Sequence, residues 1–338
     1  MKQRLDWVDY AKGVGIILVV FAHNLGGQRS SGIPLPASLG AVISYAYSFH
    51  MPLFFFLSGL FATYSYRKGF AVFSQSKLRT IFYPFVIWSL ILETIQVNMA
   101  AYVNHPLSGQ HSPLLFLIRP VEQMWFLQAL FLIYMSFALA QKLAVQPKWF
   151  FLISALLTLI VSPLIRDETV KRILFHFIFF GAGVGLQSGV NARILGAKTG
   201  PLLAVFLAAL CVQLLLVFGS PSVRLFRGSD ALEHVAMAFL GIASIAAVSE
   251  VFNRLQRLSW LRLIGQYSMP IFLMHTIFGS GTRIILARFL HLDNPYLHAG
   301  LELATGIGVP MLIAFLLSLR NTPWVFEWPA PGRLRVAQ

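Results

Sequence analysis

Residues 9–25 read DYAKGVGIILVVFAHNL, an apolar stretch with a lysine near its start and a histidine near its end. A helix that crosses a lipid bilayer needs roughly 20 mostly apolar residues. An ionisable side chain inside such a helix costs free energy, so it marks a functional candidate. On a helical wheel Lys12 and His23 share one face, and Asp9 lies close to both. The lysine and the histidine are roughly 16 Å apart along the axis, so they can contact the two ends of a long ligand but not one reacting atom.

The composition around this stretch is typical of a membrane protein. Of the 338 residues, 57% are hydrophobic and 11% are charged, whereas an ordinary soluble domain carries roughly 25% charged residues. These proportions argue against a water-soluble globule and against a disordered chain.

Ten segments are long and apolar enough to span a bilayer, some of them only roughly, and short loops join them. We therefore predict an all-α polytopic membrane protein with about ten transmembrane helices in a single bundle. Residues 1–338 are expected to form one integral-membrane domain. The expected spans are 8–26, 40–64, 80–99, 122–141, 147–165, 172–188, 199–219, 231–252, 258–280 and 299–319.

The net charge of +14 arises from 26 Lys and Arg against 12 Asp and Glu. On a soluble protein this excess would indicate nucleic acid as a partner. Here the basic residues are scattered between long apolar runs, so we expect a lipid bilayer and no nucleic acid. The loops on one side of the ten expected spans hold the larger share of Lys and Arg, which places both termini in the cytoplasm.

Two further histidines are expected at the depth of His23. His50 and His275 lie at similar distances from the inner ends of their expected spans, and Pro52 and Pro270 interrupt the helix backbone near them. Backbone groups freed in this way survive in a membrane only beside protein or a water-filled cavity. We infer a polar cavity in the outer half of the bilayer, where these histidines can bind substrate. A metal site is not expected, because no carboxylate or second local ligand accompanies the histidines.

Each candidate also has a structural interpretation. Lys12 lies near the end of its span and can extend its ammonium group to the lipid headgroups. His23 can be satisfied by a hydrogen bond from a neighbouring helix. Lys77 and Arg79 precede the third expected span, where they are either ordinary positive-inside charge or a cytoplasmic mouth that binds phosphates.

Five segments resemble the bacterial integral-membrane acyltransferase family usually called acyltransferase family 3. They occur in the family's order, and the chain is similar to stand-alone members that O-acetylate sugars, such as fucose O-acetyltransferases and exopolysaccharide acetyltransferases. The segments are RLDWVDYAKGVGIILVVFAHNL (4–25), SFHMPLFFFLSGLF (48–61), KLRTIFYPFVIW (77–88), MWFLQALFLIYM (124–135) and SMPIFLMHTIF (268–278).

The resemblance implies roles for particular residues. Family members carry a basic residue, ten further residues and a histidine in the first span, and this pattern falls on Lys12 and His23, with Lys where the family often has Arg. A second basic cluster falls on Lys77 and Arg79, although some members have two arginines where this chain has one. The resemblance further implies acetyl-CoA as the cytoplasmic acyl donor, a carbohydrate hydroxyl as acceptor, and the bacterial plasma (inner) membrane as location. No permanently bound cofactor is implied, because acetyl-CoA is a co-substrate.

A mechanism follows from these roles. A sugar hydroxyl needs a base when it attacks a thioester, and histidine suits that task near neutral pH, so His23 is the candidate base. Coenzyme A phosphates held by the basic residues at the inner mouth would place the acetyl group near His23. Lys12 is the second catalytic candidate, and Asp9 can orient it from one turn away or bind substrate. His50 can bind the acceptor or polarise the thioester carbonyl. Direct transfer and an acetyl-enzyme on His23 are both compatible with the sequence.

Two other functions compete with the acyltransferase hypothesis. Polar residues at depth and proline-broken spans also fit a secondary transporter of a small polar solute, although the sequence has no inverted pair of similar halves. A non-catalytic membrane scaffold would tolerate replacement of Lys12 and His23. The sequence does not indicate an oligomeric state.

Overall fold

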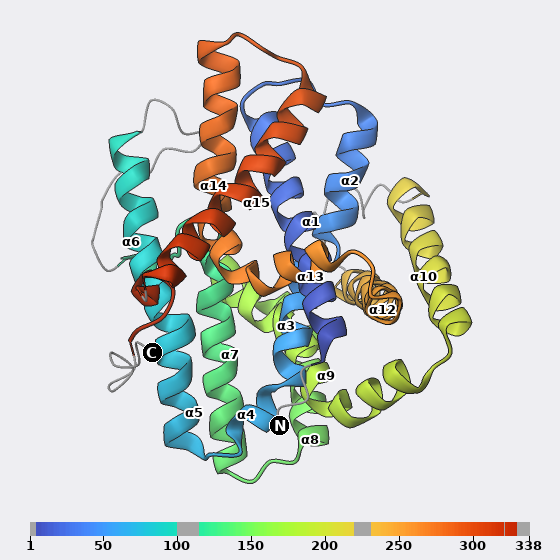
Figure 1. Ribbon diagram of the computed structural model, residues 1–338. Helices are drawn as coiled ribbons and strands as arrows, with labels where there is room; N and C mark the ends of the chain where they lie inside the picture. Colours follow the sequence, from blue (N-terminus) through green and yellow to red (C-terminus); the bar gives the residue numbers. More distant parts are fainter. Residues whose placement is uncertain (1–4, 100–114, 220–230, 321, 330–338) are drawn as a thin grey trace.

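The computed structural model describes residues 5–99, 115–219, 231–320 and 322–329, and every regular element within these ranges is helical (Figure 1). The predicted all-α polytopic class is confirmed, because ten helical stretches in the described part of the chain are long and apolar enough to cross a membrane. These ten candidate spans are Asp6–Ser30, Ala37–Leu60, Phe70–Asn98, Glu122–Lys142, Pro147–Leu164, Glu168–Gln187, Thr199–Gly219, Leu232–Leu255, Ser268–Phe289 and Pro295–Leu319.

Several candidate spans contain more than one helical element. The principal α-helices are α1 (Asp6–Ser30), α2 (Ala37–Tyr47), α3 (His50–Leu60), α4 (Ala62–Tyr66), α5 (Phe70–Lys77), α6 (Tyr83–Asn98), α7 (Trp125–Lys142), α8 (Pro147–Leu156), α9 (Glu168–Gly196), α10 (Thr199–Gly219), α12 (Ala231–Leu255), α13 (Ser259–Gln266), α14 (Ser268–Ile284) and α15 (Pro295–Leu319). The shorter elements are π-helical at Leu78–Phe82, Leu157–Val161 and Ile285–Phe289, and 3-10 helical at Leu115–Leu117, Glu122–Met124, Ser162–Leu164 and Pro323–Val325.

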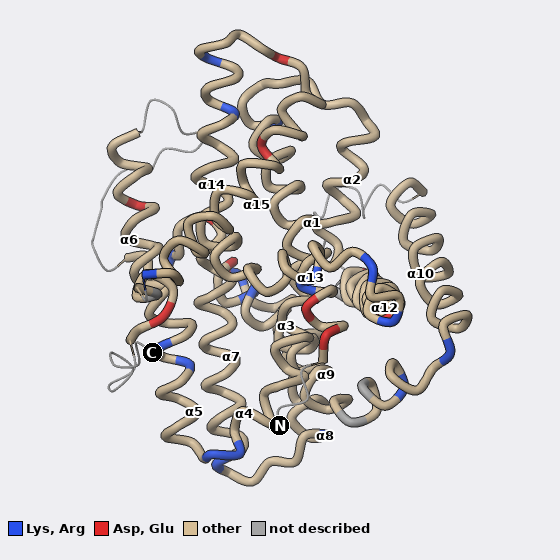
Figure 2. Tube along the Cα trace, in the orientation of Figure 1, with Lys and Arg blue, Asp and Glu red and all other residues tan. Residues whose placement is uncertain are grey.

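The molecule has an apolar exterior and polar groups inside. On α10, Leu215 and Phe218 are 67% and 55% exposed. Gln213 on the same helix is fully buried and donates a hydrogen bond to the Met237 carbonyl at 3.0 Å. Long stretches of the helices carry no charged residue (Figure 2). Lipid is the solvent that matches such a surface.

The helices cross at wide angles around a shared core. In Figure 1, α12 is seen end-on while α7 and α14 lie lengthwise, so the spans do not form a parallel bundle. One continuous cluster of buried apolar side chains nevertheless joins α1, α3, α7, α9, α12 and α14.

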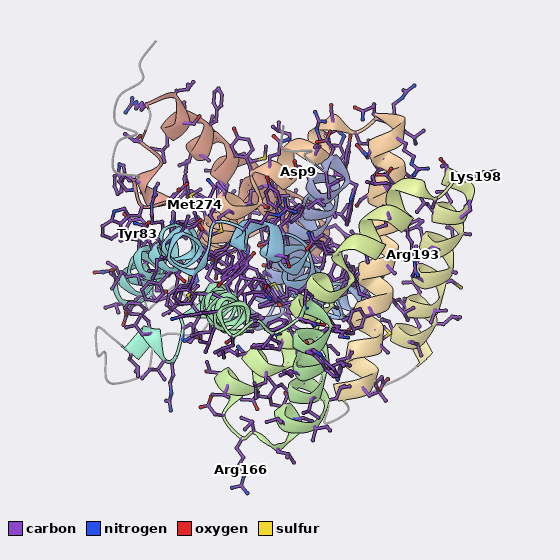
Figure 3. All side chains as sticks on the ribbon, turned by 90° about the horizontal axis from the view of Figure 1, so that it is seen from below. Asp9, Tyr83, Arg166, Arg193, Lys198 and Met274 are labelled. Atoms are coloured by element: carbon purple, nitrogen blue, oxygen red, sulfur yellow. The ribbon has the colours of Figure 1, made fainter. Side chains whose placement is uncertain are left out.

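Helix α1 runs through the middle of the molecule and contacts α2, α3, α12, α13, α14 and α15. Its closest neighbour is α13, because two glycines allow the backbones to touch. A Cβ at Gly13 would overlap the Leu261 carbonyl oxygen, and a Cβ at Gly265 would overlap the Asp9 carbonyl oxygen. The segment that carries Lys12 is therefore packed against α13 on one side, and Figure 3 shows Asp9 near the junction of α1 and α13.

The expected ninth span at 258–280 is wrong in its bounds. Residues 259–266 form the separate helix α13, which leaves Trp260 and Leu263 about half exposed, and the candidate span begins only at Ser268. The polar and small residues around Tyr267 interrupt the helix. Average hydropathy along a sequence window does not register such a local break.

The expected second span at 40–64 is two helices, α2 and α3, separated by a turn at Ser48 and Phe49. Pro52 lies in the first turn of α3, where its missing N–H costs no helical hydrogen bond. Phe49 is fully buried against α12, and a Cβ at Gly241 would overlap its ring. This packing fixes the turn and thereby the position of His50, the first residue of α3.

The third span begins earlier than residue 80, at Phe70. Lys77 therefore ends α5, and Arg79 lies in the π-helical turn Leu78–Phe82 between α5 and α6. Both residues are part of the helical stretch and not of a preceding loop, because the stretch FAVFSQSK is itself helical despite its polar residues.

Candidate active site

Three imidazole rings from three helices meet beside α1. Nδ1 of His23 lies 2.9 Å from Nε2 of His275, and the two rings are stacked with their centroids 5.2 Å apart. The His50 ring is 6.2 Å from the His23 ring and nearly perpendicular to it. The structure thus brings together the three histidines that the sequence places at a similar depth.

The hydrogen bonds of His275 assign the proton positions in the pair. Its Nδ1 lies 2.8 Å from the Phe272 carbonyl oxygen, so Nδ1 carries the proton and donates it. Nε2 of His275 is then an acceptor, and the Nδ1–H of His23 donates to it. This leaves Nε2 of His23 with its lone pair, which is the form a general base requires.

His50 has the same tautomer for a similar reason. Its Nδ1 lies 2.6 Å from the Ala46 carbonyl oxygen and donates to it. Nε2 is buried and has no hydrogen-bond partner among the residues that the structure describes. A neutral His50 of this form accepts a hydrogen bond through Nε2, so it suits a hydroxyl of a substrate better than a carbonyl oxygen.

The three histidines differ in solvent exposure. His50 and His275 are 1% and 0% exposed, whereas His23 is half-buried. Tyr47, at the end of α2, is 39% exposed and places its ring 5.9 Å from His23 and 5.0 Å from His50. His23 and His50 both retain a lone pair on Nε2, and His23 is the more exposed of the two residues.

The geometry of the histidines favours a hydrogen bond over a shared metal ion. Two imidazole nitrogens on one tetrahedral zinc lie about 3.3 Å apart, given Zn–N distances of about 2.0 Å. The 2.9 Å between His23 and His275 is a hydrogen-bond distance. No group of three or more His, Cys, Asp or Glu side chains in the described part of the chain has an arrangement that could hold a metal.

At the other end of this stretch of α1, Lys12 is paired with Asp9. Nζ of Lys12 is 3.9 Å from Oδ1 of Asp9, and the Lys12 side chain is 36% exposed while that of Asp9 is 10% exposed. Arg262 of α13 pairs with Asp6 at 3.3 Å. The start of α1 is thus a charged, partly accessible region, roughly 16 Å along the helix axis from His23.

Lys77 and Arg79 have other partners. Nζ of Lys77 lies 4.0 Å from the centroid of the Tyr134 ring on α7. Arg79 pairs with Glu327 at 3.5 Å and donates to the Trp328 carbonyl at 2.8 Å. The expected phosphate-binding mouth is therefore not one preformed cluster, because Arg79 is engaged by the segment that follows α15.

Sequence reasoning missed two residues beside the histidines. Asn24 is 3% exposed, contacts α14 and α15 where Gly279 and Gly306 leave room, and its Nδ2 has no partner within the described ranges. Its place directly after His23 in the motif AHNL was the available signal. Tyr47 carries no signal beyond its spacing of three residues from His50.

The fold and these contacts define a polytopic membrane protein with a cluster of three imidazoles, of which that of His23 is the most exposed. The sequence model of the family described as "Acyltransferase domain" matches residues 5–319, from the start of α1 to the end of α15. The chain belongs to this acyltransferase family, as its motifs indicate.

One curated relative is similar to about half of the chain. Nodulation protein NolL from Sinorhizobium fredii is 30% identical over 169 residues. The match covers 47% of this chain and 44% of the relative, so the chain spans less than half the length of that protein. No solved structure matches the chain.

Proposed function

We propose that the protein is a membrane O-acetyltransferase that moves an acetyl group from cytoplasmic acetyl-CoA to a sugar hydroxyl of an exported polysaccharide or glycolipid. The proposal follows from membership of an acyltransferase family and from one observation in particular. That observation is the hydrogen bond from His23 to His275, which leaves Nε2 of the more accessible imidazole able to take a proton. A transporter has no comparable support.

In the proposed reaction, Nε2 of His23 removes the proton of the sugar hydroxyl as its oxygen attacks the thioester carbonyl carbon. The new C–O bond replaces the C–S bond, and the proton passes from His23 to the departing thiolate, which leaves as coenzyme A. His275 accepts the Nδ1–H of His23 throughout, which holds the ring in place and stabilises the transient imidazolium. Nε2 of His50 accepts a hydrogen bond from a second hydroxyl group of the sugar.

The donor would lie along α1. Its phosphates would contact the charged start of the helix, where Lys12 is held by Asp9, and its pantetheine arm would cover the roughly 16 Å to His23. Lys77 and Arg79 would add to this contact only if Arg79 exchanges Glu327 for a phosphate. In this arrangement both termini lie in the cytoplasm, and the membrane is the bacterial plasma membrane.

The proposal is tested with purified protein in nanodiscs, acetyl-CoA labelled in the acetyl group, and de-O-acetylated surface polysaccharide of the source cells. His23→Gln should lower the rate of label transfer by about 10²–10⁴-fold, the usual contribution of a general base. His298→Gln replaces another buried imidazole, which pairs with Glu302 outside the cluster, and should keep the parent rate. Equal rates for His23→Gln and the parent would refute the assignment of the base.

The same assay separates the two chemical routes. After acetyl-CoA is added without acceptor, intact-mass analysis of the parent protein would detect an acetyl group held on His23. Its absence in His23→Gln and its transfer to added acceptor would establish an acetyl-enzyme. A parent protein that stays unmodified yet turns over would establish direct transfer.

A further inference from the structure

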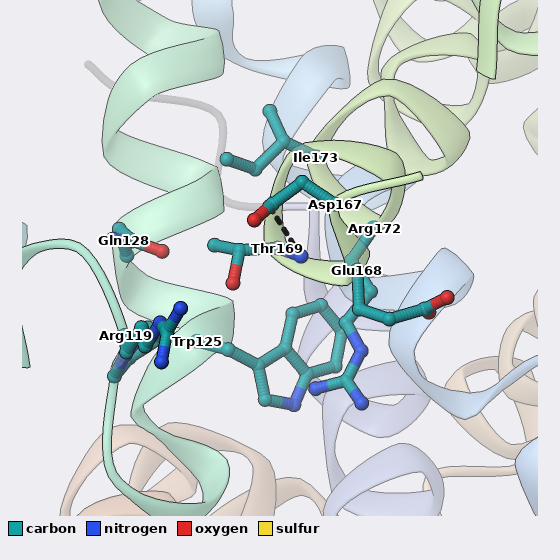
Figure 4. A pocket seen from close by; sticks show the side chains of 9 residues that line it. Arg119, Trp125, Gln128, Asp167, Glu168, Thr169, Arg172 and Ile173 are labelled. Atoms are coloured by element: carbon teal, nitrogen blue, oxygen red, sulfur yellow. Dashed lines mark hydrogen bonds between the residues drawn. The ribbon is translucent and has the colours of Figure 1, made fainter. Parts of the chain in front are cut away.

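A second concave site lies away from the histidines. A cavity of about 380 Å³ opens between the start of α7, the start of α9 and the segment at Arg119 and Pro120 (Figure 4). The mechanism proposed above uses none of its lining residues. Its size is that of a pocket for a small ligand.

A buried acceptor points into this cavity. Gln128 of α7 is 8% exposed. Its side-chain Nε2 donates to the Leu117 carbonyl at 2.6 Å, so the remaining amide atom, Oε1, is the acceptor oxygen. Oε1 has no hydrogen-bond partner in the described part of the chain, and Figure 4 shows it directed toward the cavity. A buried oxygen without a donor costs free energy, so a ligand that donates a hydrogen bond is favoured there.

An aromatic wall lies beside this acceptor. Trp125 is half-buried, and Figure 4 shows its indole ring along one side of the cavity. The Arg172 guanidinium lies 5.7 Å from the indole centroid and the His176 ring 5.1 Å from it, which holds the indole in place. An indole offers a flat apolar face, the kind of surface on which the C–H face of a sugar ring packs.

The polar groups of the cavity are mixed in kind. Arg119 and Arg172 are balanced by Asp167 and Glu168, and the hydroxyl of Thr169 adds a group that can donate or accept. Asp167 itself caps α9 by accepting from the Thr169 and Val170 amides. A phosphate or carboxylate ligand would call for an excess of cations. A balanced set of donors and acceptors beside an aromatic face fits a neutral polyhydroxylated ring.

The cavity lies near the histidine site without opening on the reacting atoms. Ring contacts lead from Trp125 to Phe126 at 6.4 Å, from Phe126 to Phe272 at 5.1 Å, and from Phe272 to His275 at 6.1 Å. Because successive spans alternate in direction, the starts of α7 and α9 lie on the same side of the membrane as the end of α1, which is the end near His23. None of the three histidines lines the cavity, so a sugar held there is not the unit that is acetylated, but it can belong to the same chain.

We infer that the cavity between α7 and α9 is a saccharide subsite, which holds a sugar unit of the acceptor chain at a distance from the unit that is acetylated. Trp125 supplies the stacking surface and Gln128 accepts a sugar hydroxyl. The inference rests on the proposed function, since it names an acceptor subsite of that enzyme.

Binding is measured first and without turnover, on the His23→Gln protein in nanodiscs. The probes are fragments of one to four sugars released from the de-O-acetylated surface polysaccharide of the source cells. Adding Gln128→Met should weaken binding of the longer fragments about fivefold, the effect expected for one lost hydrogen bond, and Trp125→Leu should weaken it further. Gln213→Met is the matched control, because Gln213 is also buried with an Oε1 that has no partner in the described ranges, but it lies on α10.

The outcomes separate this inference from the function on which it rests. Equal affinity of the Gln128→Met, Gln213→Met and unmodified backgrounds for all fragments would overturn the saccharide subsite. Gln128-dependent binding in protein that has His23 but transfers no acetyl group would keep the subsite and refute the acetyltransferase. If the subsite and the acetyltransferase are both correct, the Gln128→Met protein still acetylates the shortest fragment at the parent rate. In that protein, longer fragments no longer give a higher kcat/KM than the shortest one.

Discussion

At the scale of single residues, the hydrogen bond between His23 and His275 decides which nitrogen can act. His275 has no ring nitrogen left for the substrate, because Nε2 accepts from His23 and Nδ1 donates to the Phe272 carbonyl. It is a positioning residue that accepts from His23 and is in turn held by the Phe272 carbonyl. The reactivity of the accessible imidazole therefore depends on a side chain 252 residues away.

This dependence predicts a graded effect at His275. His275→Ala should lower kcat at least about tenfold, because His23 loses the partner that holds its ring and tautomer. His275→Asn should recover part of the rate, since an amide oxygen can accept the Nδ1–H of His23. Both variants should keep the parent KM for acetyl-CoA in steady-state assays. A parallel rise of that KM would show instead that the donor site has been disturbed.

Lys12 is the residue at which the donor hypothesis can be tested most directly. Lys12→Met should weaken acetyl-CoA binding about tenfold, the order expected for one charge-assisted hydrogen bond at a partly exposed site. Lys12→Arg should retain binding. Isothermal titration of each protein with acetyl-CoA gives the dissociation constants, and identical values for all three proteins would exclude contact between Lys12 and the phosphates.

At the scale of elements, the junction of α1 and α13 holds the start of α1 in place. The two helices touch through backbone atoms at Gly13 and Gly265. Arg262 of α13 adds an ion pair to Asp6. A short helix that lies across α1 thus fixes the region that carries Asp9 and Lys12.

A methyl group at this junction should be costly. Gly265→Ala places a Cβ against the Asp9 backbone, and overpacking of this kind typically costs about 1–3 kcal/mol. We expect a lower Tm in thermal unfolding of the detergent-solubilised protein. Gly308→Ala is the control, because a Cβ there meets nothing within 4 Å. Equal Tm values for the two variants would contradict the close contact.

At the scale of the whole molecule, the segment after α15 returns to the third span. Trp88 donates to the Val325 carbonyl at 2.8 Å, and Arg79 binds Glu327 and Trp328. If Arg79 serves mainly this docking, Arg79→Ala and Glu327→Ala should lower Tm by less in combination than the sum of their separate effects. Neither should change the affinity for acetyl-CoA. A loss of affinity in Arg79→Ala alone would assign the guanidinium to the donor phosphates.

The orientation of the whole molecule can be read by cysteine labelling. Cys211 is the single cysteine of the chain, so Cys211→Ala gives a cysteine-free background. With cytoplasmic termini, a membrane-impermeant maleimide added to intact cells should label Asp293→Cys, in the turn before α15, and should not label Lys68→Cys, in the turn before α5. The reverse pattern would invert the topology and place the charged start of α1 on the outer side.

The sequence alone determined the class of the protein. Ten apolar stretches of bilayer length, a low charge content and five ordered motifs depend on the local order of residues, and they were sufficient to predict an all-α polytopic acyltransferase-family chain. The spacing of Lys12 and His23 on one helix face is likewise a property of a regular helix.

The tertiary structure decided what these residues contact. The His23–His275 hydrogen bond, the separate helix α13, the partners of Arg79 and the cavity at Gln128 all depend on side chains or backbone breaks that hydropathy averages out. Several join residues more than 200 positions apart. Local sequence sets the length and polarity of a helix. The rotation and crossing of helices depend on how their side chains fit together, so the contacts of the site follow only from the packed molecule.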